Sequence, residues 1–296
     1  MIRVFLLVSL GLLWAARLSA IKAAGLSGIP VHVVVSVSTF GIAIMFSLVA
    51  TFRSAWPPLS RATLFFYVLS GLLGFILPFS VESLVAPHLP VFILVVIIAT
   101  MPIMTLGLSA LIGHQRLNVG TITAVILGFL GVLFLIWDTA RFGEAGQADL
   151  VWVAVAFGVP VLYAANTVFI ATRWPAAADA IQVAHAQALI LSVAALIGGL
   201  TFGGLRVWSE ATLNVPAIAL IILCEGGALM LYLKLARTYG AIFVSFANYI
   251  SMLFAALIGA HVFGDRITWY SALAAVAIIA SVVIYQRGTR RQEQPS

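Results

Sequence analysis

The sequence predicts an all-α polytopic membrane protein, with ten transmembrane helices arranged as two inverted five-helix repeats. The first observation behind this prediction is composition, because the 296 residues are 63% hydrophobic and only 8% charged, whereas soluble domains carry about 25% charged residues. The second is spacing, since long apolar runs recur about every 25–35 residues and each would cross roughly 30 Å of hydrocarbon as a helix. The third is a weak similarity between the two halves of the chain. This composition excludes a water-facing globular surface.

Each apolar run is interpreted as a helix and not as a strand of a barrel, because the runs are continuously apolar and do not alternate. The loops between them are short, and the longest, from Asp138 to Asp149, separates the fifth and sixth spans. No stretch would therefore hold a soluble domain. The ten predicted spans are approximately 4–22, 31–51, 64–85, 90–112, 119–137, 150–171, 181–204, 215–235, 241–262 and 268–286.

The positive charges in the short loops predict the orientation of the spans. An N-terminus in the cytoplasm places ten basic residues inside and four outside. Both termini are therefore expected in the cytoplasm, and the membrane is expected to be the bacterial cytoplasmic (inner) membrane. The inner set is Arg3, Arg53, Arg61, Arg116, Arg173, Lys234, Arg237, Arg287, Arg290 and Arg291, and the outer set is Lys22, Arg141, Arg206 and Arg266.

The start of the chain has an alternative interpretation as a cleaved signal peptide. Arg3, the apolar run from Val4 to Ala16 and the small residues Ser19 and Ala20 are typical of one. Removal of this segment would leave nine spans, put the termini on opposite sides and destroy the internal repeat. The ten-span interpretation is therefore preferred.

The two halves resemble each other at an offset near 150 residues. Because five spans is an odd number, the second half would lie upside down relative to the first, an architecture typical of secondary transporters with a site near the midplane. We expect a first repeat over residues 1–140, a second over 150–287 and a polar cytoplasmic tail over 288–296. The matching segments are Leu13-Trp14-Ala15-Ala16-Arg17 with Leu162-Tyr163-Ala164-Ala165-Asn166, and Gly113-His114-Gln115-Arg116-Leu117 with Phe263-Gly264-Asp265-Arg266-Ile267.

These same segments carry a resemblance to a known family. The opening motifs of spans 1 and 6, the turns before spans 5 and 10, and Lys22 at the end of the first span are similar to motifs of the drug/metabolite transporter superfamily, specifically its ten-helix EamA-like transporters. The resemblance runs over essentially the whole chain. It implies a central cavity lined mainly by spans 1, 3, 4, 6, 8 and 9, with alternating access to the two sides of the membrane.

Three ionisable residues lie well inside the spans: Arg17, Glu82 and Glu225. A charge at mid-span costs roughly 2.5–3.5 kcal/mol on insertion scales, so such residues are candidate sites. Glu225 would carry a proton or bind a substrate ammonium, or would be a protonated acid that hydrogen bonds between helices beside Gly226 and Gly227. Arg17 would bind a carboxylate, in which case Arg17 and Glu225 would hold the two ends of a zwitterion. The alternatives are an Arg17 that snorkels to the interface and a structural Arg17–Glu82 pair.

Polar and aromatic residues complete the candidate site. Trp14 shares a helical face with Arg17, Tyr163 and Asn166 occupy the equivalent positions of the second half, and Tyr232 shares a face with Glu225. Packing and hydrogen bonding across helices is the alternative for each. The candidates for substrate binding or coupling are Glu225, Arg17, Asn166, Tyr163, Trp14, Tyr232, Asn248, Tyr249 and Glu82.

Other residues give weaker signals. Pro78, Pro102 and Pro160 would interrupt their helices and are candidate hinges. His185 would relay protons, although a packing histidine is the more common case. The lone Cys224 excludes an internal disulfide and a thiolate metal cage.

The sequence therefore favours a secondary active transporter that exports amino acids or related small metabolites. No nucleotide-binding, metal-ligating or catalytic motif is present, so we expect no enzyme activity, no cofactor and no metal. The expected partners are a small-molecule substrate and membrane lipid, without nucleic acid, and a homodimer stays open. The alternatives are a non-transporting membrane sensor or assembly subunit, and an intramembrane lipid-processing enzyme.

Overall fold

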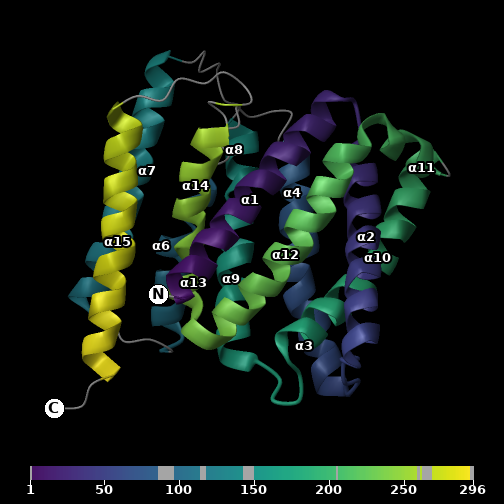
Figure 1. Ribbon diagram of the computed structural model, residues 1–296, viewed down its shortest axis with the longest axis horizontal. Coiled ribbons are helices and arrows are strands. Elements are labelled where there is room, and N and C mark those ends of the chain that lie inside the picture. Colours follow the sequence, from purple (N-terminus) through teal and green to yellow (C-terminus); the bar gives the residue numbers. More distant parts are fainter. Residues whose placement is uncertain are drawn as a thin grey trace.

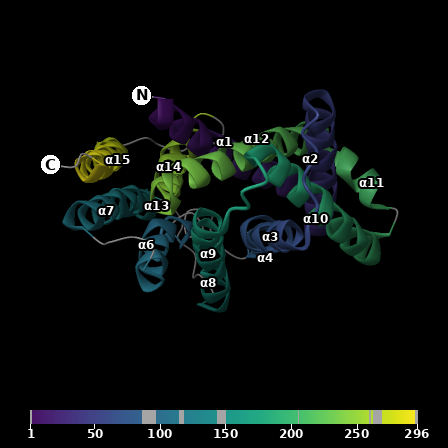
Figure 2. The same ribbon diagram turned by 90° about the horizontal axis from the view of Figure 1, so that it is seen from below.

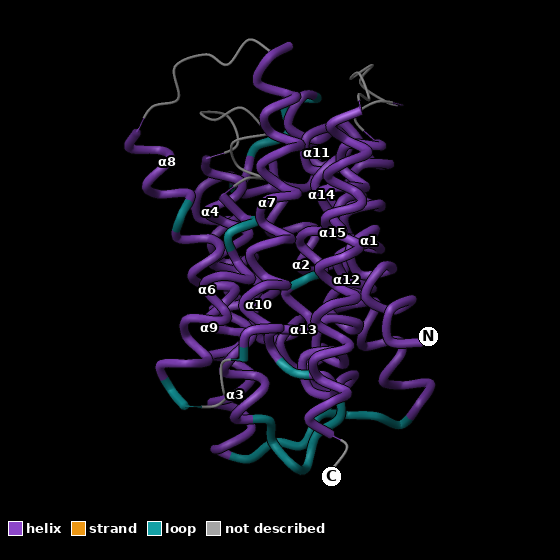
Figure 3. Tube along the Cα trace, turned by 90° about the vertical axis from the view of Figure 1, so that its left-hand side faces the viewer, coloured by secondary structure: helices purple, strands orange, loops and turns teal. Residues whose placement is uncertain are grey.

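A computed structural model describes residues 2–85, 97–113, 118–142, 150–204, 206–258, 261 and 269–293. Every regular element in these residues is helical, and the long helices run up and down a single bundle (Figures 1 and 3). The first helix begins and the last helix ends toward the same end of the bundle, in the lower half of Figure 1. The all-helical prediction is confirmed for the described residues.

The helices follow the order of the predicted spans. The first half of the chain forms α1 (Ile2–Leu26), α2 (Val31–Arg53), α3 (Arg61–Gly71), a π-helix (Leu72–Ile76), α4 (Leu77–Val85), α6 (Met101–Leu111) and α7 (Val119–Phe142). The second half forms α8 (Leu150–Ala156), α9 (Gly158–Arg173), α10 (Ala180–Gly203), α11 (Arg206–Ala211), a 3₁₀ turn (Thr212–Asn214), α12 (Val215–Tyr239), α13 (Ala241–Ser245), α14 (Ala247–Ile258) and α15 (Trp269–Glu293).

Six helical segments of the described residues are long and apolar enough to span a membrane. They cover Ile2–Leu26, Val31–Arg53, Arg61–Val85, Val151–Arg173, Ala180–Gly203 and Arg206–Tyr239. The other four predicted spans appear as shorter apolar helices, Met101–Leu111, Val119–Gly131, Ala241–Ala255 and Val276–Tyr285. The prediction of ten spans is therefore confirmed in part.

Local hydrogen bonds fix where several helices begin. Ser60 and Thr63 form a capping box at the start of α3, and Asp179 and Gln182 form one at the start of α10. Asn214 caps α12 by accepting from the Ala217 amide. Each cap satisfies amide groups that the first turn of a helix leaves free.

The three intramembrane prolines lie at helix interruptions. A proline has no N–H to donate to the carbonyl four residues earlier. Pro78 thus leaves the Gly74 carbonyl without its α-helical hydrogen-bond partner, and Gly74 lies within the π-helix. Pro160 likewise leaves the Ala156 carbonyl without its helical hydrogen-bond partner, and α8 ends at Ala156. Pro102 stands in the first turn of α6, where the missing N–H costs nothing.

The helices pack in pairs across the two halves of the chain. α1 lies along α12 and α14, and α9 packs against α6 and against the third helical segment, α3 to α4. α2 lies along α10 and α7 along α15, at opposite ends of the bundle (Figures 1 and 2).

Small residues bring α2 and α10 close together. A Cβ at Gly199 would meet Ser36, and one at Gly203 would meet His32. The Ser36 hydroxyl lies 2.7 Å from the Ala195 carbonyl oxygen across the interface. This is the small-residue packing typical of membrane helices.

The second pair of repeat motifs falls mostly outside the described residues, at 114–117 and 263–267. The first pair lies on α1 and α9, which are described in full.

Candidate functional site

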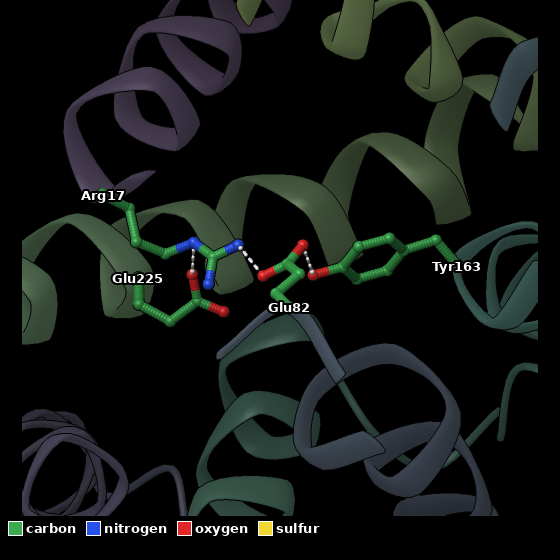
Figure 4. Close-up of polar contacts among 4 residues, drawn as sticks. All are labelled: Arg17, Glu82, Tyr163 and Glu225. Atoms are coloured by element: carbon green, nitrogen blue, oxygen red, sulfur yellow. Dashed lines mark hydrogen bonds and ion pairs between the residues drawn. The ribbon is translucent and has the colours of Figure 1, made fainter. Parts of the chain in front are cut away.

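Arg17 is the centre of a buried group of charged side chains. It lies on α1 and is only 3% exposed, as is Glu82 on α4, while Glu225 on α12 is 7% exposed. Arg17 Nη2 donates to Glu82 Oε2 over 2.8 Å, and Arg17 Nε lies 3.0 Å from Glu225 Oε2. Figure 4 shows the guanidinium between the two carboxylates. These three residues, called the charged cluster below, are the three ionisable residues that the sequence places inside spans.

The two carboxylates are held in different ways. Glu82 is fixed at both oxygens, since Oε2 accepts from Arg17 and Oε1 accepts from the Tyr163 hydroxyl over 3.2 Å (Figure 4). Glu225 Oε2 pairs with Arg17 Nε by charge alone, without hydrogen-bond geometry, and has no hydrogen-bond partner among the described residues. Glu225 is therefore the less constrained of the two.

Apolar and small neighbours shape the cluster. The Arg17 guanidinium lies 5.4 Å from the centroid of the Phe79 ring, within cation–π range. Beside Glu225, Gly226 leaves room for Met45 and Gly227 faces Leu13. Gly226 thus lets α2 approach α12, whereas a Cβ at Gly227 would make only ordinary contact with Leu13.

Burial distinguishes a paired Arg17 from one that snorkels to the interface. A snorkelling arginine would be exposed at its tip, and Arg17 is buried. The Arg17–Glu82 pair is present, and Glu225 pairs with the same guanidinium. Arg17 and Glu225 contact each other directly, so in this arrangement they do not hold opposite ends of a zwitterion. Loss of one partner from such a buried group typically costs about 3–5 kcal/mol.

A second, neutral polar group surrounds the Tyr232 hydroxyl. Asn166 Nδ2 donates to this hydroxyl over 3.0 Å, and Thr167 Oγ1 lies 2.7 Å from it. Thr167 gives its single proton to the Tyr163 carbonyl, so Tyr232 donates to Thr167. Because Tyr163 also donates to Glu82, the neutral group and the charged cluster are joined through Tyr163.

Two further residues complete this neutral group. The Trp14 and Tyr232 rings lie 6.1 Å apart between centroids. Gly74 in the π-helix makes room for the Asn166 amide, because a Cβ there would overlap it. A π-helix inside a longer helix frequently marks a functional site.

A small cavity of about 30 Å³ opens beside the charged cluster. It has room for one or two groups the size of a water molecule. Its walls come from both halves of the chain. The lining residues are Trp14, Arg17, Leu18, Glu82, Ile98, Ala99, Tyr163, Asn248, Ser251 and Met252.

The structure thus brings seven of the nine predicted site residues together in the charged cluster and the neutral group. Of these, Trp14, Arg17, Glu82 and Tyr163 line the cavity, together with Asn248. The Asn248 amide nitrogen also lies 2.8 Å from Met101 Sδ and donates to the Ser245 carbonyl over 3.1 Å. Tyr249 faces elsewhere. Its hydroxyl donates to the Val125 carbonyl over 3.0 Å, and its ring covers Gly128, so it packs α14 against α7.

His185 and Gln187 on α10 are not among the residues that line the cavity. His185 Nε2 lies 3.0 Å from the Ser47 hydroxyl, and the His185 ring is 5.2 Å from the Trp56 ring. Since Ser47 gives its proton to the Ala43 carbonyl, His185 donates from Nε2. Gln187 bonds Ser70. These contacts fit the packing interpretation of His185.

The sequence interpretation missed Thr167, Phe79 and Gly74. Thr167 adjoins Asn166 and was identifiable only by that position, whereas Phe79 and Gly74 carry no polar side chain. Among the described residues, no three His, Cys, Asp or Glu side chains come close enough to hold a metal ion.

Comparison with known proteins supports the sequence resemblance. Residues 1–137 match the EamA-like transporter family, which confirms the resemblance over these residues and is consistent with the drug/metabolite transporter superfamily. No curated protein matches the chain in sequence. One solved structure, described only as a crystal structure of a protein, aligns with a TM-score of 0.75 over 99% of each chain at 14% sequence identity. At that identity the likeness concerns the fold alone. The family match and the apolar helices together identify an integral membrane protein and indicate a membrane transporter.

Proposed function

We propose that this chain, whose first 137 residues match the EamA-like transporter family, is a secondary active transporter that exports amino acids or related small metabolites by alternating access. The observation that carries the proposal is the charged cluster of Arg17, Glu82 and Glu225 beside a cavity. Charged residues inside membrane helices are costly and typically mark substrate or ion pathways. The membrane in this proposal is the bacterial cytoplasmic membrane.

An inverted repeat is part of the proposal, and the helix pairing supports it. At the offset near 150, α1 corresponds to α9, α12 to the segment α3–α4, and α14 to α6. α1 packs against α12 and α14, and α9 packs against the corresponding partners in the first half. α2 pairs with its own counterpart α10, and α7 with α15. Each helix of one half thus packs against helices of the other half that correspond to the partners of its own counterpart. Two inverted repeats related by a two-fold axis would pack in this way.

The position of the cavity fits a transport site between two repeats. Arg17 and Glu82 come from the first half, and Tyr163 and Asn248 come from the second. A relative movement of the halves would therefore reshape the cavity walls directly. In inverted-repeat transporters the substrate site lies at this kind of interface.

Efflux from cells that overproduce the protein tests the proposal. A metabolite-wide comparison of the medium should show faster export of particular metabolites than in cells without the protein. Glu225→Gln should reduce that export at least about tenfold while membrane insertion is kept, because it removes one charge of the cluster. Glu210→Gln is the matched control, since it makes the same change on α11, outside the charged cluster.

Two outcomes would contradict the proposal. An unchanged medium in overproducing cells would argue against export, and unchanged export by Glu225→Gln across the pH range would remove Glu225 from the mechanism. Topology has a separate test, because reporters fused after residue 287 should report the cytoplasm. A reporter outside the membrane would contradict the predicted orientation.

A further inference from the structure

The charges of the cluster do not balance. Arg17 contributes one positive charge, and Glu82 and Glu225 contribute two negative charges when both are ionised, which leaves a formal excess of one negative charge. The other described side chains at the cluster, Phe79 and Tyr163, are neutral. Burial of an uncompensated charge costs several kcal/mol in effective terms. The cluster therefore favours one additional positive charge.

Glu225 is the carboxylate that can take this charge. Both oxygens of Glu82 are occupied, by Arg17 and by Tyr163. Glu225 Oε2 has no hydrogen-bond partner among the described residues, and its side chain keeps about 10% of its surface exposed. The ionisable side chains near Glu225 are Arg17, Glu82, Tyr163 and its chain neighbour Cys224. Glu225 thus has unused hydrogen-bond acceptor capacity and the larger exposed surface of the two carboxylates.

Charge and size together select the occupant. A proton on Glu225 would neutralise the cluster, and so would the ammonium group of a bound molecule. The cavity of about 30 Å³, which is lined by Arg17 and Glu82 of the cluster, has room for a head group of that size. A carboxylate would have to compete with Glu82 and Glu225 for the same guanidinium. Arg17 Nε and Nη1 lack hydrogen-bond partners among the described residues, but both atoms are buried and Nε already faces Glu225.

We propose that the charged cluster is a site for one exchangeable positive charge, taken in turn by a proton and by the ammonium group of a small organic amine. The amine enters as its ammonium ion and binds the Glu225 carboxylate, and the proton held there leaves to water on the same side of the membrane. Charge is conserved, and no further reactant is needed. This inference rests on the proposed transport function and narrows its substrate class to monocationic amines exchanged for protons.

Two matched sets of probes test the substrate class with the purified full-length chain in detergent. Ethylamine, alanine and propionate share one carbon skeleton, and phenethylamine, phenylalanine and 3-phenylpropionate share another. Each set presents the ammonium alone, both charges, and the carboxylate alone. Binding is measured calorimetrically, and proton release is measured in weakly buffered solution.

We expect at least one amine to bind at least about tenfold more tightly than its amino acid and its acid, which corresponds to about 1.4 kcal/mol. Each bound amine should release one proton. Glu225→Gln should abolish proton release and weaken amine binding at least about tenfold, whereas Glu210→Gln should change neither. If Glu225→Gln does not survive purification, Glu225→Asp keeps the charge and should still release one proton per bound amine.

Several outcomes overturn the inference. These are binding of no amine, equal or tighter binding of the amino acid or the acid, and amine binding without proton release. A transport assay separates this failure from failure of the proposed function. If phenylalanine but not phenethylamine crosses the membrane of proteoliposomes, the proposed transport function holds and the amine site is wrong. If amines bind and release protons but no probe is transported, the amine site holds and the proposed transport function is wrong.

Discussion

Helices α1 and α9 occupy corresponding places in the two halves but carry different chemistry. Each contributes an aromatic ring and a polar side chain three residues later, Trp14 with Arg17 and Tyr163 with Asn166. Arg17 needs carboxylates from two other helices, while Asn166 donates to one phenol. The pairing of helices can thus be alike in the two halves although only one of these two corresponding helices carries a charged member of the cluster. The comparison teaches that fold symmetry does not predict which of two corresponding helices carries the ionic chemistry.

The largest expected effect is at the charged member of the pair. Arg17→Gln leaves two buried carboxylates without their cation and should lower the free energy of unfolding by about 3–5 kcal/mol. Asn166→Leu on α9 should cost only about 1 kcal/mol, because it removes one neutral hydrogen bond. Chemical unfolding in detergent measures both.

The double variant Arg17→Gln/Glu225→Gln should recover part of the stability lost in Arg17→Gln, since it removes one of the unpaired carboxylates. Equal losses for Arg17→Gln and Asn166→Leu would break the comparison between α1 and α9.

A smaller effect is expected where the π-helix meets α9. Gly74→Ala places a methyl group against the Asn166 amide and should cost about 1–3 kcal/mol by overpacking. Gly107→Ala on α6 is the matched control, because nothing lies within 4 Å of its Cβ position. Melting temperatures in detergent would show the difference.

If the loss comes from this contact, Asn166→Ala should make Gly74→Ala nearly neutral. A loss that persists in the double variant would place its cause elsewhere, in the helix itself.

The smallest expected effect concerns the hydroxyl that joins the two polar groups. Tyr163→Phe removes the hydrogen bond to Glu82 and should cost about 1 kcal/mol of stability, a typical value for bonds between membrane helices. Tyr249→Phe loses a comparable bond to the Val125 carbonyl and should cost about the same. Only Tyr163→Phe should change export, because only Tyr163 lines the cavity. A matching change of export in Tyr249→Phe would extend the site to α14 and α7.

The sequence predicted the helices and the charged members of the site for one physical reason. Arg17, Glu82 and Glu225 interrupt apolar runs at a cost that a sequence reader can see. Their convergence was not predictable, because it depends on how each helix is rotated against its neighbours. Even so, the Arg17–Glu82 pair was among the alternatives, since the two residues lie at similar depth in adjacent parts of the predicted bundle.

The same limit explains where the structure differs from what the sequence indicated. Tyr249 was selected because it is polar and lies in a span, yet its side of α14 faces α7. Gly74 contributes by the absence of a side chain, which no count of polar residues detects. The predicted span over 150–171 is continuous, whereas the helix is broken at Phe157 by the missing donor of Pro160. The predicted end at residue 22 precedes the end of α1 at Leu26, because the helix continues past the apolar window.

The π-helix at Leu72–Ile76 also sets the direction of every side chain that follows it. One residue turns an α-helix by about 100°, and a π-turn holds one residue more than an α-turn. Counted from Arg61 with regular α-helical geometry, Glu82 would therefore point about a quarter turn away from its observed direction. The wider turn acts as an angular offset that aims Glu82 at Arg17 and the bundle interior. The geometry of this single turn, six to ten residues before Glu82, thus decides whether the carboxylate meets its partner or faces lipid.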